Sequence, residues 1–202
     1  VYEMNIDGSG VRRLTHGKYD SFDARYLPDG RIVFMSTRRG QAVQAGVESA
    51  TRTLEQPDLP DVYVRCGGDA RRPVAVYTLH TMAADGSDLR AISPFEMFEW
   101  HPSVAHDGTI LYSRWDYVDR ENGPYMSLWA INPDGTNARL VYGNYTKAPH
   151  CTFEPRAIPG SHKIVFIASA HHAQTMGSLV LLDPTVGMAG AEPITRLTPQ
   201  VV

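Results

Sequence analysis

One pattern of residues returns three times in the same order along this chain, and it constrains the fold more than any other feature. Each copy starts with a tight-turn sequence followed by a run rich in β-branched and aromatic residues, as in LPDGRIVFMSTR, AHDGTILYSRWD and IPGSHKIVFIASA. A second such run then leads through another turn to a short closing run, as in SLWAINPDGT followed by ARLVY. The opening VYEMNIDGSGVRRLT matches only the second half of a copy.

The residue types in each copy predict four strands joined by tight turns. Gly adopts positive φ without a Cβ clash and Asp tolerates it, so Asp-Gly pairs are typical of hairpin turns. Val, Ile, Phe and Tyr pack well on a pleated sheet. Gly86 and Gly135 occupy equivalent turns 49 positions apart. A period of about 45–50 residues with four strands is typical of a β-propeller blade.

We therefore expect an all-β chain that forms a β-propeller fragment of about three and a half four-stranded blades. The first strand of the three full blades is predicted at 22–27, 100–105 and 153–158, and the second at 31–37, 109–115 and 163–169. Residues 1–202 are expected to form a single partial propeller domain. An insertion at about 41–72 falls between the second and third strands of one blade, and its first half (41–56) contains good helix formers. Because closed propellers have about four to eight blades, we expect the rest of the propeller to lie outside this sequence.

Composition excludes several function classes. A net charge of −3 over 202 residues gives no reason to expect nucleic-acid binding. No run of about 18 apolar residues predicts a membrane-spanning helix. The chain has no P-loop, no dinucleotide fingerprint and no G-x-S-x-G elbow. Cys66 and Cys151 form neither CxxC nor CxxCH, so a covalent haem has no attachment motif. A disulfide between these cysteines and two separate thiols are both open.

The repeat resembles that of a known family. LPDGRIVFMSTRRG, VYEMNIDGSGVRRLT and TRLT resemble the TolB-type, WD-like propeller repeat, over most of the chain outside 41–72. More narrowly, VYTLHTMAADGSDLRAISPFEMFEWHPSV, RWDYVDRENGPYMSLWAINPDGTNARLVYGN and KIVFIASAHH are similar to the propeller middle domain of hydrazine synthase alpha subunits and their uncharacterised bacterial relatives. This resemblance implies a periplasmic or otherwise extracytoplasmic location in an assembly that carries c-type haem. Because CxxCH is missing here, the resemblance does not identify any residue of this chain as a haem-binding residue.

The two ends of the predicted blades differ in character. The turns within each hairpin are short and stereotyped at one end, which indicates a structural role. The longer connections gather at the other end, the loop-rich face, and function on rigid scaffolds usually lies on such loops. The candidate ligand-binding residues on this face are Arg38, Arg39, Arg114, Trp115, Asp116, Tyr117, Asp119, His171 and His172. Alternatively, Trp115 caps the blade core and Asp116 braces its loop through Arg114.

The same face carries a candidate metal site. Aligning FDARYLPDG, WHPSVAHDG and FEPRAIPG places Asp23, His101 and Glu154 at one equivalent position of the innermost strand. Imidazole and carboxylate groups are good ligands for Zn, Fe or Mn, so a divalent metal is the candidate cofactor. His150 and Cys151 lie close to Glu154 in the sequence and complete the candidate set.

The alternative is a solvated polar channel in which Arg25 and Arg156 pair the two carboxylates. On these grounds we expect a propeller module that binds a protein partner or a small ligand through its loop-rich face. The alternative function is a subunit of a hydrazine-synthase-like metal or haem redox enzyme with its site on that face. Whether the chain is an enzyme is left open by its sequence.

Overall fold

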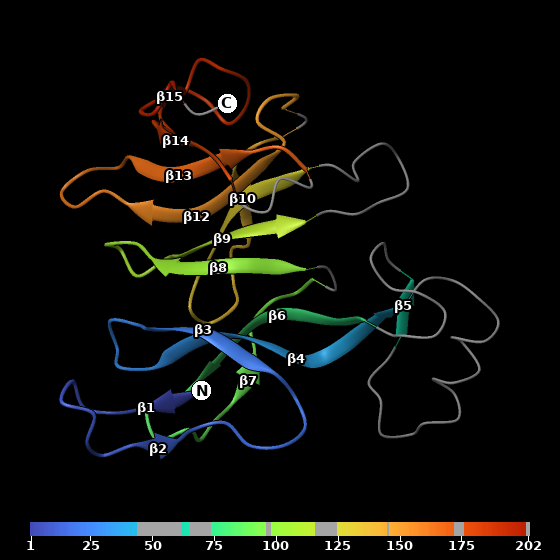
Figure 1. The fold of residues 1–202 in the computed structure, drawn as a ribbon, viewed down its shortest axis with the longest axis vertical. Coiled ribbons are helices and arrows are strands. Elements are labelled where there is room, and N and C mark those ends of the chain that lie inside the picture. Colours follow the sequence, from blue (N-terminus) through green and yellow to red (C-terminus); the bar gives the residue numbers. More distant parts are fainter. Residues whose placement is uncertain are drawn as a thin grey trace. The chain divides into compact units, whose positions relative to one another are not determined.

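A computed structural model describes residues 1–43, 62–64, 74–95, 98–115, 125–144, 146–171 and 176–200. The chain divides into two compact units, Val1–Glu96 (unit 1) and Met97–Val202 (unit 2). Figure 1 shows that the labelled elements are all strands. The predicted all-β class is therefore confirmed, and the described residues contain no helix long and apolar enough to cross a membrane.

Unit 1 contains a two-stranded sheet and a five-stranded sheet. The strands are β1 (Tyr2–Glu3), β2 (Arg12–Arg13), β3 (Ser21–Tyr26), β4 (Ile32–Val43), β5 (Val62–Val64), β6 (Val74–Met82) and β7 (Arg90–Ala91). β1 pairs with β2, as expected for the second half of a repeat. The order β3-β4-β6-β7 forms a complete antiparallel meander, and β5 lies parallel to β4. The strand pairing of β4 with β6 includes residues 41–42, which were expected inside the insertion; residues 44–61 lie outside the described part.

Unit 2 contains two further meanders. The first consists of β8 (Glu99–Val104), β9 (Ile110–Trp115), β10 (Met126–Ile131) and β11 (Arg139–Tyr142), and the second of β12 (Cys151–Ala157), β13 (Ile164–Ser169), β14 (Gly177–Leu182) and β15 (Ile194–Arg196). Every neighbouring pair within a meander is antiparallel. The two meanders meet at one parallel bridge between Met126 of β10 and Cys151 of β12. The first and second strands of all three full repeats begin within two residues of their predicted positions.

Each unit has its own apolar core. In unit 1, Leu14, Ile32, Phe34 and Met82 form a buried cluster. In unit 2, Phe166 and Tyr142 pack with their ring centroids 5.7 Å apart, among Leu128, Val180 and other buried residues of both meanders. Burying a side chain of this size stabilises the fold by about 1.5–3 kcal/mol, so these clusters hold the meanders together.

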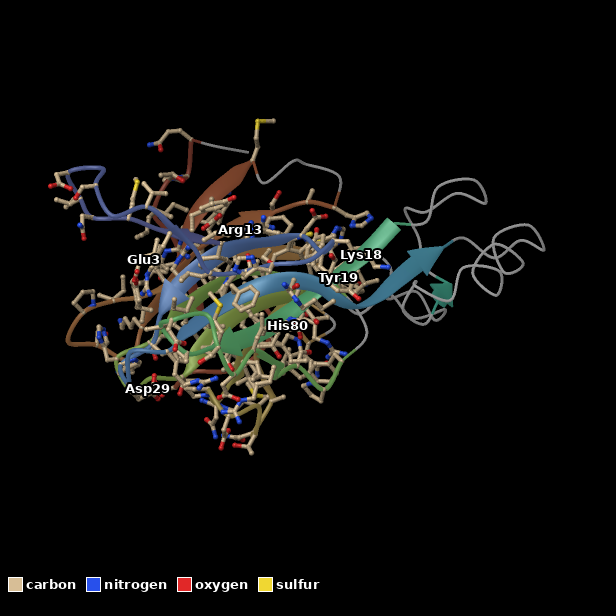
Figure 2. The ribbon with its side chains drawn as sticks, turned by 90° about the horizontal axis from the view of Figure 1, so that it is seen from below. Glu3, Arg13, Lys18, Tyr19, Asp29 and His80 are labelled. Atoms are coloured by element: carbon tan, nitrogen blue, oxygen red, sulfur yellow. The ribbon has the colours of Figure 1, made fainter. Side chains whose placement is uncertain are left out.

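The Asp-Gly turns are built by one repeated hydrogen-bond pattern. A carboxylate oxygen of Asp7, Asp85 and Asp134 accepts a bond of 2.9 Å from the backbone N–H two residues later. The same oxygen accepts a bond of 2.6–2.7 Å from the hydroxyl of that later Ser or Thr. The structural role predicted for these turns is thus confirmed. In unit 1, Glu3 and Asp29 mark this turn end, and Lys18 and Tyr19 lie toward the opposite, loop-rich end (Figure 2).

Candidate functional site

The innermost strand of each full repeat carries a β-bulge at the same position. The pairing of β3, β8 and β12 with the following strand shifts register there. The residues at the bulge are Asp23, His101 and Glu154, with φ of 52°, 54° and 51°. Their equivalence, predicted by aligning the three copies, agrees with this shared geometry. Positive φ costs a residue with a side chain about 1–2 kcal/mol, and bulges redirect the side chains they carry.

In unit 1 the bulge residue is paired within its own strand. Arg25 Nη2 lies 2.6 Å from Asp23 Oδ1. The preceding aromatic residue, Phe22, is 40% exposed and meets the ring of Tyr77 edge-on at 5.2 Å. Both rings line an open hollow of about 430 Å³ together with Asp20. The loop-rich end of unit 1 therefore carries two aromatic rings at this hollow, and the Asp23 carboxylate is ion-paired with Arg25.

In unit 2 two bulges come together. One carboxylate oxygen of Glu154 in β12 lies 3.4 Å from His101 Nε2 of β8. The other carboxylate oxygen lies 2.8 Å from Arg156 Nη2. Arg25 and Arg156 thus occupy the same position in two repeats and pair the same position's carboxylate, as the polar-channel alternative predicts. The side chains of His101, Glu154 and Arg156 are 18%, 39% and 43% exposed, so solvent reaches this triad.

An aromatic cluster contacts this triad through His101. The ring of Trp100 lies 5.7 Å from Phe98, 6.0 Å from Trp115 and 6.4 Å from Phe153. The ring of Phe153 also meets His101 edge-on at 5.6 Å. His171 lies 5.8 Å from Trp115, which is only 8% exposed. Whether Trp115 contacts a ligand or caps the blade core stays a prediction. We call the following set the rim cluster: Phe98, Trp100, His101, Trp115, Phe153, Glu154, Arg156 and His171.

Two of the predicted arginines brace the scaffold. Arg38 of unit 1 donates to the hydroxyls of Ser21 and Ser36 and to the carbonyl of His16, at 2.6–2.8 Å. Arg114 of unit 2 lies over the ring of Trp129, 4.4 Å from its centroid. Arg38 thus links three backbone or side-chain groups of unit 1, and Arg114 packs on an aromatic ring of unit 2. Both contacts stabilise the loop-rich end of their unit.

Several predicted residues fall outside the described part of the chain. These are Asp116, Tyr117, Asp119, His172, the side chain of Arg39, and Cys66. Their proposed contacts, and the pairing of Cys66 with Cys151, stay predictions.

The described residues do not form a metal-ligand set. No group of three or more His, Cys, Asp or Glu side chains among them is placed to hold an ion. Cys151 is completely buried, and burial raises the pKa of its thiol to about 12. This opposes the thiolate form that binds metals. His150 instead meets Tyr125 edge-on at 5.6 Å.

The sequence analysis missed the aromatic residue that precedes each bulge. Phe22, Trp100 and Phe153 were not among the candidates, because an aromatic residue in a strand usually packs in the core. The aligned strings FD, WH and FE already contain the signal, an aromatic followed by a polar residue at one repeat position.

Comparison with known proteins identifies the fold. Hydrazine synthase from Kuenenia stuttgartiensis matches with a TM-score of 0.71 at 17% identity, over 98% of this chain and 29% of that chain. Puromycin hydrolase matches with a TM-score of 0.51 at 14% identity, over 92% of this chain and 22% of that chain. No family model and no curated protein sequence matches. The chain spans less than a third of either structure's length, and at these identities the likeness shows the fold alone, which is propeller-like.

Proposed function

We propose that this protein is a propeller-type binding scaffold that holds a protein partner at the loop-rich end of unit 2. The observation that supports the proposal is the rim cluster, in which aromatic rings from β8, β9 and β12 lie beside a partly exposed triad of His101, Glu154 and Arg156.

The composition of the rim cluster suits a protein interface. Trp, Tyr and Arg contribute most of the binding energy at such interfaces, where they are surrounded by groups that exclude water. Trp100 is half-buried and Arg156 is 43% exposed, so both retain surface for a partner. His101 and Arg156 already hold the Glu154 side chain in one orientation. A partner that contacts Glu154 therefore loses little side-chain entropy on binding.

The scaffold under the rim cluster is preorganised. Trp100 and His101 belong to β8, and Phe153 and Glu154 to β12, so strand pairing fixes their backbones. Ser113 Oγ of β9 donates to the carbonyl of Thr152 in β12, which ties the two meanders together close to the cluster. Rigid sites lose less entropy on binding than mobile loops do.

Site-specific photo-crosslinking in the cells of origin tests the proposal. A benzophenone amino acid is placed at Trp100, and in a matched control at Asp134, which lies in an exposed turn of the same unit. We expect one discrete crosslinked protein from the Trp100 position and none from the Asp134 position. Equal crosslinking at both positions, or none at Trp100 in folded protein, would reject a partner on this face.

The proposal includes an extracytoplasmic location, which follows from the sequence resemblance. Cell fractionation with compartment markers tests it.

The enzyme alternative has its own test, since a metal- or haem-dependent redox subunit purifies with bound metal or shows haem absorbance. Near-stoichiometric metal or a haem spectrum would favour that alternative over a scaffold.

A further inference from the structure

An arginine begins the closing strand of three repeats, but its surroundings differ. Arg12, Arg90 and Arg139 are the first residues of β2, β7 and β11. Strand pairing places them opposite Glu3, Thr81 and Ala130, respectively. The same position of the third strand therefore changes from an acid to a hydroxyl residue to a small apolar residue.

The guanidinium groups of Arg12 and Arg139 therefore differ in their contacts. Arg12 forms an ion pair with Glu3 and donates to the carbonyl of Ala84 at 2.9 Å. The side chain of Arg139 is exposed and forms no hydrogen bond or ion pair with the described residues. Arg139 acts electrostatically on Asp107: a hydrogen bond from the Thr109 N–H is the main cause that lowers the pKa of Asp107, and the charge of Arg139 adds a smaller effect. The five N–H donors of Arg139 thus remain available for a ligand.

Arg139 stands at a pocket in unit 2. The pocket has a volume of about 500 Å³ and opens at the turn end, between the two meanders. Its floor is apolar and includes Leu111, Ala130, Val141 and Ile164. This volume lies within the range of about 300–1,000 Å³ that is usual for small-molecule sites.

The pocket walls are held by hydrogen bonds between the meanders. On one side, His106 Nε2 donates to the carbonyl of Ile158 at 2.9 Å. On the other side, the Gly143 N–H donates to the carbonyl of Met188 at 2.9 Å, and the Tyr142 hydroxyl to that of Gly190 at 2.6 Å. The connection 183–193 is longer than its counterparts 83–89 and 132–138, and these bonds fold it back onto the pocket. The site is therefore formed before any ligand arrives.

The other charged groups at the mouth already have partners. Asp183 accepts from the Thr185 hydroxyl at 2.5 Å and from His162 at 3.0 Å, and Lys163 lies 3.5 Å from it. The Thr185 bond is the largest cause that lowers the pKa of Asp183 to about 2, so its carboxylate is ionised and balances Lys163 at neutral pH. Asp107, which also lines the pocket, accepts a hydrogen bond of 2.9 Å from the Thr109 N–H and forms no ion pair with Arg139 among the described residues. Arg139 is thus the arginine or lysine of the lining whose side chain has no hydrogen-bond or ion-pair partner in the described part of the chain, and an anionic ligand can bind it.

We propose that this pocket binds a small amphipathic monocarboxylate, with its hydrocarbon chain on the apolar floor and its carboxylate on Arg139. A guanidinium group binds a carboxylate through two parallel hydrogen bonds, which fixes the orientation of the chain. The site lies at the opposite end of the strands from the rim cluster and does not depend on the function proposed there.

Isothermal titration with octanoate tests the proposal, with acetate and 1-octanol as probes of the head group and the chain alone. We expect octanoate to bind more tightly than either, and Arg139→Gln to weaken octanoate about ten-fold or more while 1-octanol is unaffected. The matched control Arg90→Gln changes the equivalent arginine of unit 1 and should bind octanoate like the wild type.

A second variant tests the pocket independently of the charge. Ala157 lines it from β12, so Ala157→Leu should weaken octanoate and 1-octanol together. Absence of octanoate binding to the wild type, unchanged binding in Arg139→Gln, or equal losses in Arg139→Gln and Arg90→Gln would each overturn the proposal.

Discussion

Two glycines of unit 1 have nearly the same backbone conformation in different surroundings. Gly30 and Gly86 have φ of 84° and 89°. A Cβ atom on Gly30 would meet nothing within 4 Å, whereas one on Gly86 would lie 2.5 Å from the carbonyl oxygen of Leu14. The turn after β6 is thus packed against the chain that follows β2, and Gly86 is required by close approach as well as by φ.

This contrast predicts unequal costs for the same substitution. Gly30→Ala should lower the free energy of unfolding by about 1–2 kcal/mol, since only the positive φ opposes Ala. Gly86→Ala should lower the free energy of unfolding by about 1 kcal/mol or more beyond the loss in Gly30→Ala, because the Leu14 backbone must also shift. Urea unfolding of both variants measures the difference. Equal losses would mean that the contact with Leu14 yields without cost.

Tyr142 predicts a dependence of stability on alkaline pH. Burial raises its pKa from 10.0 to about 12 in the folded protein. A raised folded-state pKa gives stability that is complete below pH 10 and is lost as the pH rises toward 12.

The matched variant Tyr142→Phe separates this effect from the buried Cys151 thiol. Below pH 9 the variant should be less stable by about 1 kcal/mol, because the hydrogen bond to Gly190 is gone. Above pH 10 the gap between the two proteins should narrow, since only the wild type loses the tyrosine contribution. Unfolding curves from pH 8 to 11 measure it, and a gap that stays constant would contradict the shifted pKa.

At the scale of the strand, the bulges of β3, β8 and β12 combine backbone strain with polar side chains. A residue held at positive φ persists only where the surrounding structure enforces it, and such residues gather at functional sites. In β8 and β12 the bulges place His101 and Glu154 within 3.4 Å of each other. The strained residues of β8 and β12 therefore lie at a polar contact between the two meanders of unit 2.

The bulge in β8 predicts a reversal of the usual preference for Ala over Gly in strands. At His101, with φ of 54°, the Gly variant should be more stable than the Ala variant by about 1 kcal/mol. At Ser103, in the same strand with an ordinary φ, Ala should be the more stable replacement. Thermal unfolding of the four variants tests this. Greater stability of Ala at both positions would show that the bulge does not constrain residue 101.

The elements were more predictable from sequence than their packing. The starts of β3, β4, β8, β9 and the other strands followed from local signals, namely turn residues and β-branched runs. The equivalence of Asp23, His101 and Glu154 followed from the repeat. The pocket did not, because it depends on Ala130 standing opposite Arg139 and on a connection that folds back across the sheet. Such contacts between distant residues leave no local pattern.

The whole molecule presents two kinds of surface. In unit 2 the loop-rich end carries the rim cluster, and the turn end carries the pocket that Arg139 borders. The propeller-like fold explains this separation, since the tight turns of each meander lie at one end of its strands and the longer connections lie at the other. The loop-rich end was predicted as the working face, whereas the turn end was expected to be structural only.

The most direct test of the binding-face proposal is the affinity for the protein that crosslinks at the Trp100 position. Arg156→Ala removes an exposed arm of the rim cluster, and Asp134→Ala alters an exposed turn elsewhere in unit 2. We predict that Arg156→Ala raises the dissociation constant about ten-fold or more while Asp134→Ala leaves it unchanged, with both variants folded. An unchanged dissociation constant in Arg156→Ala, or an equal rise in both variants, would contradict the assignment of this face.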